Sequence, residues 1–540
     1  MFSLLIKGGT VVDGTGRPPF RADVGLQGTK IAALGRLEDI PAGKVIDATG
    51  LVVAPGFIDF HSHADAELLR DPEDRAKLAQ GVTTEVIGNC GMSLVPGHRE
   101  SLSMLAAYAG PVLGEIPAGF QAAGVKDYFS RLTRQGIAVN VATLAGHGSI
   151  RLAVMGMAAR QAGKAEMDAM AALLEQAMSE GATGLSSGLL YPPGCYAPTG
   201  ELIALCRVVR QYGGIYVSHI RNESDGVLEA IEEALEIGRE AGIPVHISHL
   251  KACGPRNWPK IPRALALLAA AREHGQDVTW DVYPYIAGST TAASLLPPWA
   301  VAGGEAAIRE RLNSPDIRRE IKKTWQEGLP GWDNMVKSLG YDRLVINAVA
   351  HRENADCVGL TLAEIGARRQ CDPADVLLDL LQVEGGSLAI ETYHGCEETL
   401  AMILRHPLTV IGSDGIYSGD HVHPRLYGTF VRVLGRYVRE RRLLTLEEAV
   451  AKMTSRPAAR LGLKKRGLVK AGYYADLVVF DPDTVADRAT FQEPARTPAG
   501  IAAVIVNGRV AYQDGRFTGE LAGVTLTCNA AGASSSQEVK

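Results

Sequence analysis

The segment that most constrains the fold is an apolar run at residues 51–58 that ends in two histidines, His61 and His63. In an extended strand, residues two apart point to the same face. The two imidazoles would therefore point to one place at the end of a buried strand, and imidazole is a common metal ligand. Such a pair taken alone is more often a surface or core pair, so the rest of the chain must decide.

Short apolar segments recur along the chain and alternate with amphipathic ones. Four stretches with apolar spacing of three and four predict helices, at residues 165–180, 199–212, 226–241 and 261–274. We expect eight strands, at residues 51–59, 83–87, 138–144, 184–187, 215–218, 245–248, 277–282 and 408–412. This alternation predicts an α/β fold, a (β/α)8 TIM barrel, whose chemistry lies at the carboxyl ends of the strands.

Both ends of the chain contain short strands outside this alternation. Residues 1–55 include strands at 4–7 and 10–12, which Gly8 and Gly9 separate, and residues 465–526 include strands at 475–481 and 503–510. Each group is too small for a core of its own, so we expect one small β-sandwich domain built from both ends. The catalytic barrel would then span residues 56–464, and residues 527–540 would form a flexible tail.

The alternation is interrupted after the seventh strand, at about residues 284–406. This stretch contains helical patterns at 304–313, 360–369 and 374–383 and a strand-like pattern at 343–350. An insertion at this point of a barrel would cover the mouth of the active site, so we expect a lid.

Composition excludes several classes of function. A net charge of −5 gives no reason to expect nucleic acid or an anionic membrane as a partner. No apolar run reaches the roughly 18–20 residues of a membrane helix, and the first residues lack the basic start of a signal peptide. The eight cysteines form no CxxC pair, so we expect free thiols and a cytoplasmic protein. The sequence leaves the oligomeric state open.

Residues suited to metal binding follow several of the predicted strands. They are His61 and His63 after the first strand, Cys90 after the second, His219 after the fifth, His249 after the sixth and Asp414 after the eighth. One histidine in such a place is more often a core residue, but a set of six is hard to obtain from packing alone. Three nitrogen or sulfur ligands with an open position are typical of catalytic zinc.

Five segments carry a resemblance to a known family. The segments PGFIDFHSHAD, GVTTEVIGNCG, HIRNE, SHLK and IGSDG, which begin at residues 55, 81, 219, 248 and 411, together resemble the amidohydrolase superfamily. More narrowly, they are similar to the N-acyl-D-amino-acid deacylases, or D-aminoacylases, over almost the whole chain. The resemblance implies one zinc ion held tightly by Cys90, His219 and His249. It also implies an optional second position near His61 and His63, which Cys90 would bridge.

Two departures refine the resemblance. Hydantoinase-like and dihydroorotase-like relatives carry a carboxylated lysine at the end of strand four, but residues 184–191 contain no lysine. Cys90 is expected to replace that bridge, which argues against a cyclic-amide hydrolase. Ala64 stands where similar deacylases often have an acidic residue, so the occupancy of the second metal position stays open.

The remaining site candidates follow from the chemistry of amide hydrolysis. Asp414 is the candidate general base and acid, although an Asp-Gly sequence alone would be a turn. Lys251 lies two residues after His249 and so on the same face, although a surface lysine is the ordinary alternative. By resemblance, Tyr283 and Ser289 match positions that bind the substrate α-carboxylate. Tyr191 is a candidate for stabilising the oxyanion, with a structural tyrosine as the equal alternative.

The sequence thus predicts zinc-dependent hydrolysis of N-acyl-D-amino acids to a carboxylate and a free D-amino acid. The nearest alternative is a D-configured dipeptidase or another amide hydrolase of the same superfamily. A non-catalytic scaffold is disfavoured because the whole ligand set is present. The preferred side chain is open: Arg352 or Arg425 would suit an acidic one, and an apolar pocket would suit D-leucine or D-methionine.

Overall fold

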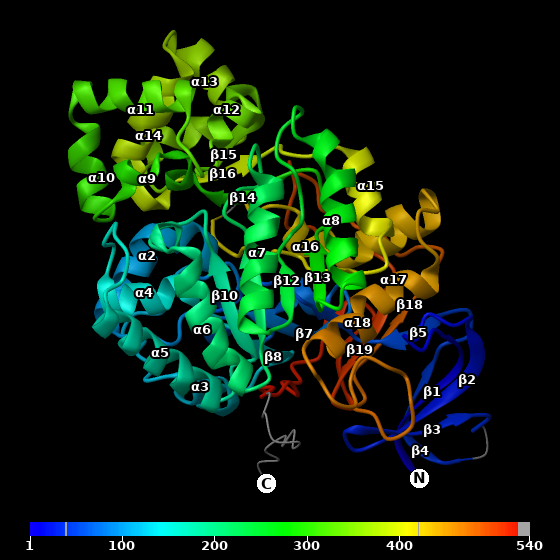
Figure 1. Cartoon of the computed structure of the whole chain (residues 1–540). Helices are drawn as coiled ribbons and strands as arrows, with labels where there is room; N and C mark the ends of the chain where they lie inside the picture. The colour runs from blue at the N-terminus through cyan, green and yellow to red at the C-terminus, as the bar shows by residue number, and fades with distance from the viewer. Residues whose placement is uncertain (38–39, 420, 528–540) are drawn as a thin grey trace.

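The computed structural model describes residues 1–37, 40–419 and 421–527. Within them, a ring of parallel strands forms a barrel at the centre of the molecule (Figure 1). Its strands are β6 (Phe57–Asp59), β7 (Val82–Ile87), β8 (Asn140–Thr143) with its continuation β9 (Ala145–Gly146), β10 (Gly184–Gly188), β11 (Ile215–His219), β12 (Val245–Ile247), β13 (Val278–Val282) and β17 (Thr409–Ile411). Strands occur at all eight predicted places in the predicted order, but the first prediction, 51–59, covers two strands. Residues 52–55 form β5, which pairs with the strands of the terminal sheet, and only Phe57–Asp59 joins the barrel.

The barrel closes where its last strand meets its first. The Asp414 N–H donates to the His61 carbonyl at 2.7 Å, and the His63 N–H donates to the Gly415 carbonyl at 3.1 Å. These bonds place the residues after β6 and those after β17 side by side. A side-chain hydrogen bond also connects these two segments. Ser413 Oγ donates to the carboxylate of Asp59, 354 residues earlier in the chain, at 2.6 Å.

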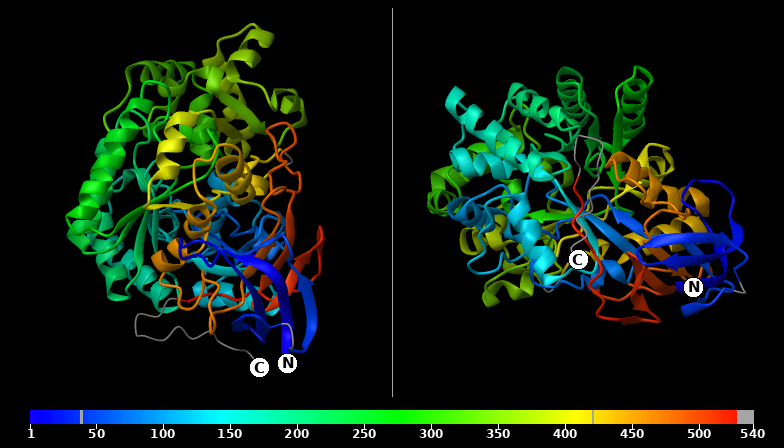
Figure 2. Two further views of the ribbon diagram at one scale, coloured as in Figure 1. Left: turned by 90° about the vertical axis from the view of Figure 1, so that its right-hand side faces the viewer. Right: turned by 90° about the horizontal axis from the view of Figure 1, so that it is seen from below.

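Helices cover the outside of the barrel (Figures 1 and 2). Apolar residues at spacings of three and four, such as those of α7, bury one face of each helix against the strands. The helices are α1 (Arg75–Leu78), α2 (Arg99–Leu113), α3 (Val125–Gln135), α4 (His147–Met155), α5 (Lys164–Ser179), α6 (Thr199–Gln211), α7 (Val227–Ala241), α8 (Ile261–Glu273), α15 (Glu397–Arg405), α16 (Arg425–Arg432), which continues as a π-helix over Val433–Glu440, α17 (Leu446–Met453) and α18 (Ser455–Arg460).

Strands from both ends of the chain form one continuous sheet at the lower right of Figure 1. β5 from the N-terminal part pairs antiparallel with β18 from the C-terminal part, and both contribute to a shared apolar core. The strands are β1 (Phe2–Val11), β2 (Phe20–Gln27), β3 (Lys30–Gly35), β4 (Ala42–Asp47), β5 (Val52–Pro55), β18 (Leu477–Phe480), β19 (Ile501–Val506), β20 (Arg509–Gln513) and β21 (Arg516–Phe517).

Two details of this sheet differ from the sequence prediction. Gly8 and Gly9 do not divide the first strand; they form a bulge within β1. A side chain at Gly9 would lie 2.6 Å from Val53, so the glycine permits close packing instead of a turn. The chain also leaves the sheet before residue 526 and returns to the barrel, where Leu526 N–H donates to the Val141 carbonyl. Apart from Thr527, the predicted tail at 527–540 lies outside the described residues.

The insertion after β13 forms a separate lobe above the barrel (Figure 1). It contains the antiparallel sheet β14 (Gly288–Thr291), β16 (Ala389–Thr392) and β15 (Leu344–Ala348) and the helices α9 (Pro298–Val301), α10 (Glu305–Leu312), α11 (Pro315–Glu327), α12 (Met335–Leu339), α13 (Leu362–Arg369) and α14 (Pro373–Glu384). α15 packs against α8 and β17 and so belongs to the barrel. The insertion therefore ends before residue 397, not at 406. No described helix is both long and apolar enough to span a membrane.

Candidate metal centre

The six predicted ligands come together at the carboxyl ends of the barrel strands. The donor atoms of His61, His63, Cys90 and Asp414 lie within 4.8 Å of one another. Those of Cys90, His219 and His249 also lie within 4.8 Å of one another and form a second group. Cys90 belongs to both groups and lies between them.

The backbone turns sharply at three of these residues. Cys90, His249 and Asp414 have φ angles of 53°, 34° and 51°, which L-residues with side chains rarely adopt. Each such residue costs on the order of 1–3 kcal/mol and persists where the surroundings hold it in place. All three lie two or three residues beyond the end of a barrel strand, so the turn directs the side chain into the mouth of the barrel. This strain was not predictable from the residue types.

Close packing fixes the position of Cys90. A Cβ atom on Gly188, the last residue of β10, would lie 2.1 Å from the Cys90 carbonyl oxygen. Any larger residue there would displace the Cys90 backbone. The glycine therefore lets β10 approach the loop after β7, and this approach positions the sulfur atom between the two groups of donors.

The donor chemistry fits a metal ion. Cys90 Sγ lies 3.3 Å from His61 Nε2 and 3.5 Å from His249 Nε2. Burial opposes ionisation of the thiol, but the two imidazoles outweigh it and hold the Cys90 pKa well below its ordinary value. The thiolate is the form that binds metals. Both ring nitrogens of His219 are buried without a hydrogen-bond partner, an arrangement that a metal ion would relieve. Sulfur and imidazole donors together favour zinc.

Two buried carboxylates orient the imidazoles. Asp281, in β13, lies 3.3 Å from His61 Nδ1 and accepts a hydrogen bond from the His249 backbone N–H at 2.9 Å. Glu223 Oε1 lies 3.0 Å from His249 Nδ1. In both histidines the Nε2 atom is thereby turned towards Cys90, which is how carboxylates usually support metal-binding histidines. Neither acid was predicted from the sequence to have a role. The available signals were an acid in the apolar strand 278–282 and a glutamate four residues after His219.

Asp414 has a second charged partner. Its Oδ1 atom lies 3.1 Å from His63 Nε2, and its Oδ2 atom lies 2.8 Å from Arg425 Nη1. Burial opposes ionisation of Asp414, but Arg425 and His61 together with the hydrogen bond from His63 hold its pKa well below the ordinary value. Arg425 is 1% exposed, and its guanidinium lies 4.7 Å from the centre of the Tyr283 ring.

The predicted substrate-binding residues face the same cavity, each with a protein partner. Lys251 Nζ donates to Glu223 at 2.6 Å, and the Tyr283 hydroxyl lies 2.9 Å from His394 Nε2. The other two contact residues of the insertion sheet: Ser289 Oγ, in β14, accepts from Asn347 at 3.1 Å, and the Tyr191 hydroxyl lies 2.9 Å from Thr290 Oγ1. The lining includes His63, Cys90, Tyr191, His219, Glu223, His249, Lys251, Tyr283, Ser289, Asp414 and Arg425. Barrel and insertion thus share one cavity.

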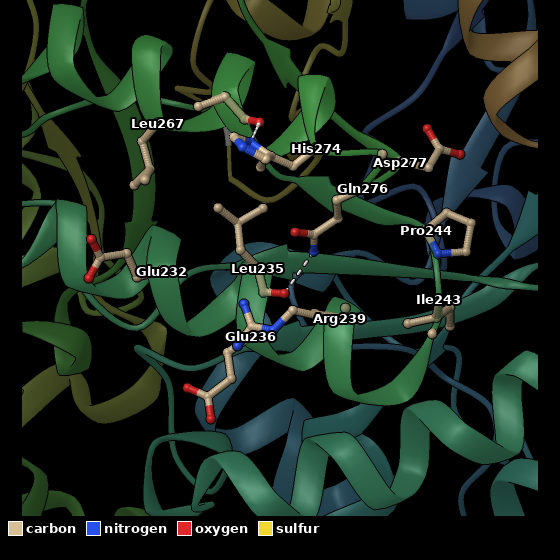
Figure 3. Close-up of a pocket in the computed structure, with 15 residues that line it drawn as sticks. Glu232, Leu235, Glu236, Arg239, Ile243, Pro244, Leu267, His274, Gln276 and Asp277 are labelled. Carbon is tan, nitrogen blue, oxygen red and sulfur yellow. Dashed lines mark hydrogen bonds between the residues drawn. The ribbon is translucent and has the colours of Figure 1, made fainter.

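A second hollow lies away from these residues, between α7 and α8 (Figure 3). It is lined by Glu232, Glu236, Arg239, His274 and Gln276 near the amino ends of β12 and β13. The side chains labelled in Figure 3 do not converge on one point. Catalysis in such barrels takes place at the carboxyl ends of the strands, so this hollow is not the candidate site.

Comparison with known proteins agrees with this arrangement. A family model described as the amidohydrolase family matches residues 44–313 and 364–512. The chain is 40% identical over 534 residues to the D-aminoacylase of Alcaligenes xylosoxydans xylosoxydans, and the match covers 98% of both chains. The chain belongs to the amidohydrolase family. Its predicted resemblance to the N-acyl-D-amino-acid deacylases is confirmed.

Two further relatives have a similar sequence identity to this chain. The N-acyl-D-glutamate deacylase of the same organism is 41% identical over 505 residues, which are 94% of this chain and 92% of that one. The crystal structure of N-acyl-D-glutamate deacylase from Bordetella bronchiseptica contains zinc and a phosphonate that mimics the tetrahedral intermediate. It superimposes with a TM-score of 0.83 at 39% identity, over 97% of this chain and 99% of that chain. The predicted barrel fold is confirmed by this family membership.

Proposed function

We propose that the protein is a zinc-dependent deacylase that hydrolyses N-acyl-D-amino acids to a carboxylate and a free D-amino acid. One observation carries the proposal: the thiolate and imidazole cluster and the Asp414 carboxylate share a cavity with two cations, Lys251 and Arg425. A cluster of this kind suits amide hydrolysis, and the cations suit a substrate with a free carboxylate. The D-aminoacylase and the zinc-containing deacylase among the relatives support this function.

The two groups of donors would differ in metal affinity. Cys90, His219 and His249 would hold one zinc ion tightly. Neither ring nitrogen of His219 has a hydrogen-bond partner, so no other group competes with the metal for this ligand. His61, His63 and Asp414 would hold an optional second ion with Cys90. There, Arg425 already engages one Asp414 oxygen and would compete for it. When bound, zinc would polarise the amide carbonyl and lower the pKa of a water molecule towards ~7.

Asp414 would move the proton. Its pKa lies well below the ordinary value, so the carboxylate is ionised at neutral pH. In this position beside the histidine cluster it would accept a proton from the attacking water. Arg425 holds Oδ2, which leaves Oδ1 directed at the histidine cluster. The same carboxyl group would then protonate the leaving nitrogen, so that the free amino acid is released.

The other lining residues would orient the substrate. Lys251 and Arg425, with Tyr283 between their cationic groups, would bind the α-carboxylate, and Ser289 would contribute a hydroxyl from the lid sheet. Burial holds the pKa of Tyr191 well above its ordinary value, so its hydroxyl keeps the proton that an oxyanion donor needs. When the α-carboxylate and the amide carbonyl of the substrate are both held, the substrate side chain can point in only one direction. The site would therefore select one enantiomer.

The direct test is an enantiomer-paired assay. Zinc-loaded protein is given N-acetyl-D- and N-acetyl-L-amino acids and a D-configured dipeptide, and the released amine is measured with ninhydrin. We expect cleavage of the N-acetyl-D substrates. The Asp414→Asn variant should retain zinc but lose about 10²–10⁴-fold in kcat. Preference for the dipeptide would favour the dipeptidase alternative, and cleavage of the L substrates alone would contradict the proposal.

We also propose a cytoplasmic location. The described cysteines, at 90, 195, 206, 253, 357, 371 and 396, are all free thiols, and Cys90 has to stay reduced to bind metal. Cell fractionation with an antibody to the protein would test this.

A further inference from the structure

The cavity contains few lysine and arginine side chains. Among the described residues that line it, Lys251 and Arg425 are the lysine and arginine side chains. Lys251 already faces Glu223 at 2.6 Å, and Arg425 already faces Asp414 at 2.8 Å. The α-carboxylate of a substrate would add one negative charge to these two pairs. A second carboxylate on the substrate would find no further cation in the lining.

The buried Glu391 illustrates how poorly this region accommodates another anion. Glu391 precedes Thr392, which lines the cavity, and it is 2% exposed. One of its carboxyl oxygens, Oε1, has no hydrogen-bond partner. Burial raises its pKa to about 8 although Arg425 acts in the opposite direction. Burial thus outweighs the attraction of Arg425, whose guanidinium already pairs with Asp414 at 2.8 Å.

Arg352 does not supply the missing charge. From the sequence, Arg352 and Arg425 are the candidates for binding an acidic side chain. Arg352 is exposed at the start of a 3-10 helix in the insertion, Arg352–Cys357, and it is not among the lining residues. Arg425 lies in the cavity but beside Asp414, where it suits the α-carboxylate.

The rest of the lining is largely apolar. Barrel loops contribute Met92, Leu190 and Ile416, α2 contributes Val112, and α12 of the insertion contributes Met335. Each is less than a tenth exposed. Methionine side chains adapt their shape to a bound apolar group. Such a surface gains from burying an alkyl or thioether side chain and loses from desolvating a carboxylate.

We propose that the cavity selects N-acyl-D-amino acids with apolar side chains, such as D-leucine and D-methionine, and discriminates against D-glutamate and D-aspartate. This proposal rests on the deacylase function proposed above. Sequence similarity does not decide the matter, because the chain is 40% identical to a D-aminoacylase and 41% identical to an N-acyl-D-glutamate deacylase. The proposal is based instead on the side chains that line the cavity of this chain.

The test compares kcat/KM of the zinc-loaded protein for the N-acetyl derivatives of D-leucine, D-methionine, D-glutamine, D-glutamate and D-aspartate. Glutamine has nearly the shape of glutamate without its charge, so the pair separates charge from size. We expect D-leucine and D-methionine to exceed D-glutamate by roughly 10²-fold or more, with D-glutamine between them. Higher values for D-glutamate or D-aspartate would overturn this proposal and leave the deacylase function standing. Absence of activity on every D substrate would contradict the deacylase function and this proposal with it.

A charge placed in the cavity provides a second test. Met335→Arg adds a cation to the apolar wall, so it should raise kcat/KM for N-acetyl-D-glutamate relative to N-acetyl-D-leucine by about 10-fold or more. The matched control is Met402→Arg, because Met402 is 44% exposed on α15, outside the cavity. This control should leave the ratio unchanged. An unchanged ratio of the two kcat/KM values in a folded Met335→Arg variant would count against the proposal. If that variant does not fold, the comparison of substrates with the wild-type protein is the deciding test.

Discussion

Arg425 and Asp414 form an ion pair inside the barrel mouth, with Nη1 and Oδ2 2.8 Å apart. Asp414 follows the last barrel strand, and Arg425 begins α16, eleven residues later in the sequence. The pair connects the proposed proton carrier to the proposed carboxylate-binding cation. A buried pair of this kind is costly to break from one side, because the remaining charge stays buried without a partner.

Removing Arg425 should therefore affect both stability and catalysis. We expect Arg425→Met to lower the free energy of unfolding by about 3–5 kcal/mol, and to raise KM for N-acetyl-D-amino acids. Adding Asp414→Asn should recover much of the stability and none of the activity, as a double-mutant cycle would measure. The control is Arg352→Met on the exposed surface of the insertion, which should change neither quantity. A stability loss in the double variant as large as in Arg425→Met would show that the pair is not coupled.

The two groups of metal donors should separate by mutation. Cys90 belongs to both groups, so Cys90→Ala should lose zinc from both positions, whereas His61→Asn should retain the ion at Cys90, His219 and His249. Zinc content after dialysis, measured by mass spectrometry, reports the difference. Cys253→Ser is the matched control, because Cys253 lines the cavity but belongs to neither group. Equal zinc loss from His61→Asn and Cys90→Ala would contradict a tight and a loose position.

The residues of the two donor groups could be located from the sequence because each lies just beyond an apolar strand. Parallel strands end at one edge of the barrel, so order along the chain already places His61, Cys90 and His249 together. The residues that support them were not predictable in this way. Glu223 and Asp281 orient the imidazole rings of His249 and His61. These contacts depend on backbone turns that cannot be recognised in the sequence.

The terminal sheet and the insertion illustrate the same limit. Gly8 and Gly9 resemble a turn locally, but packing against Val53 makes them a bulge in a longer strand. The helix at 397–405 follows the insertion in sequence, yet its buried side chains Leu400 and Ile403 assign it to the barrel. In both cases the structure is decided by contacts between segments that are far apart in the chain.

A buried lysine beneath the metal centre should be important for folding. Lys77 Nζ lies 2.9 Å from both Asp59 and Glu85, and all three side chains are fully buried. We expect Lys77→Met to lower the free energy of unfolding by about 3–5 kcal/mol, because it leaves two carboxylates facing each other without a cation. Denaturant unfolding measures this. Lys164→Met is the control, since its pair with Asp168 is exposed and should contribute little. Equal stability of the two variants would contradict a structural role for Lys77.

Glu391 should make stability depend on pH between about 4 and about 8. Burial raises its pKa to about 8 in the folded protein, against about 4.3 in an unfolded chain. Between these values the folded state holds one proton more than the unfolded state, so stability falls as pH rises. The fall is about 1.4 kcal/mol per pH unit and at most about 5 kcal/mol in total.

Glu391→Gln isolates this contribution because glutamine does not ionise. Wild type and variant should have similar free energies of unfolding near pH 5, and the variant should become the more stable one as pH approaches 8. Urea unfolding at pH 5, 6.5 and 8 provides the comparison, with the exposed Glu353→Gln as a control that should follow wild type at each pH. The difference between the two proteins matters here, because histidines titrate in the same range and affect both curves equally. A constant difference across the three pH values would mean that Glu391 is ionised in the folded protein, and that Arg425 has charge to spare for a second carboxylate.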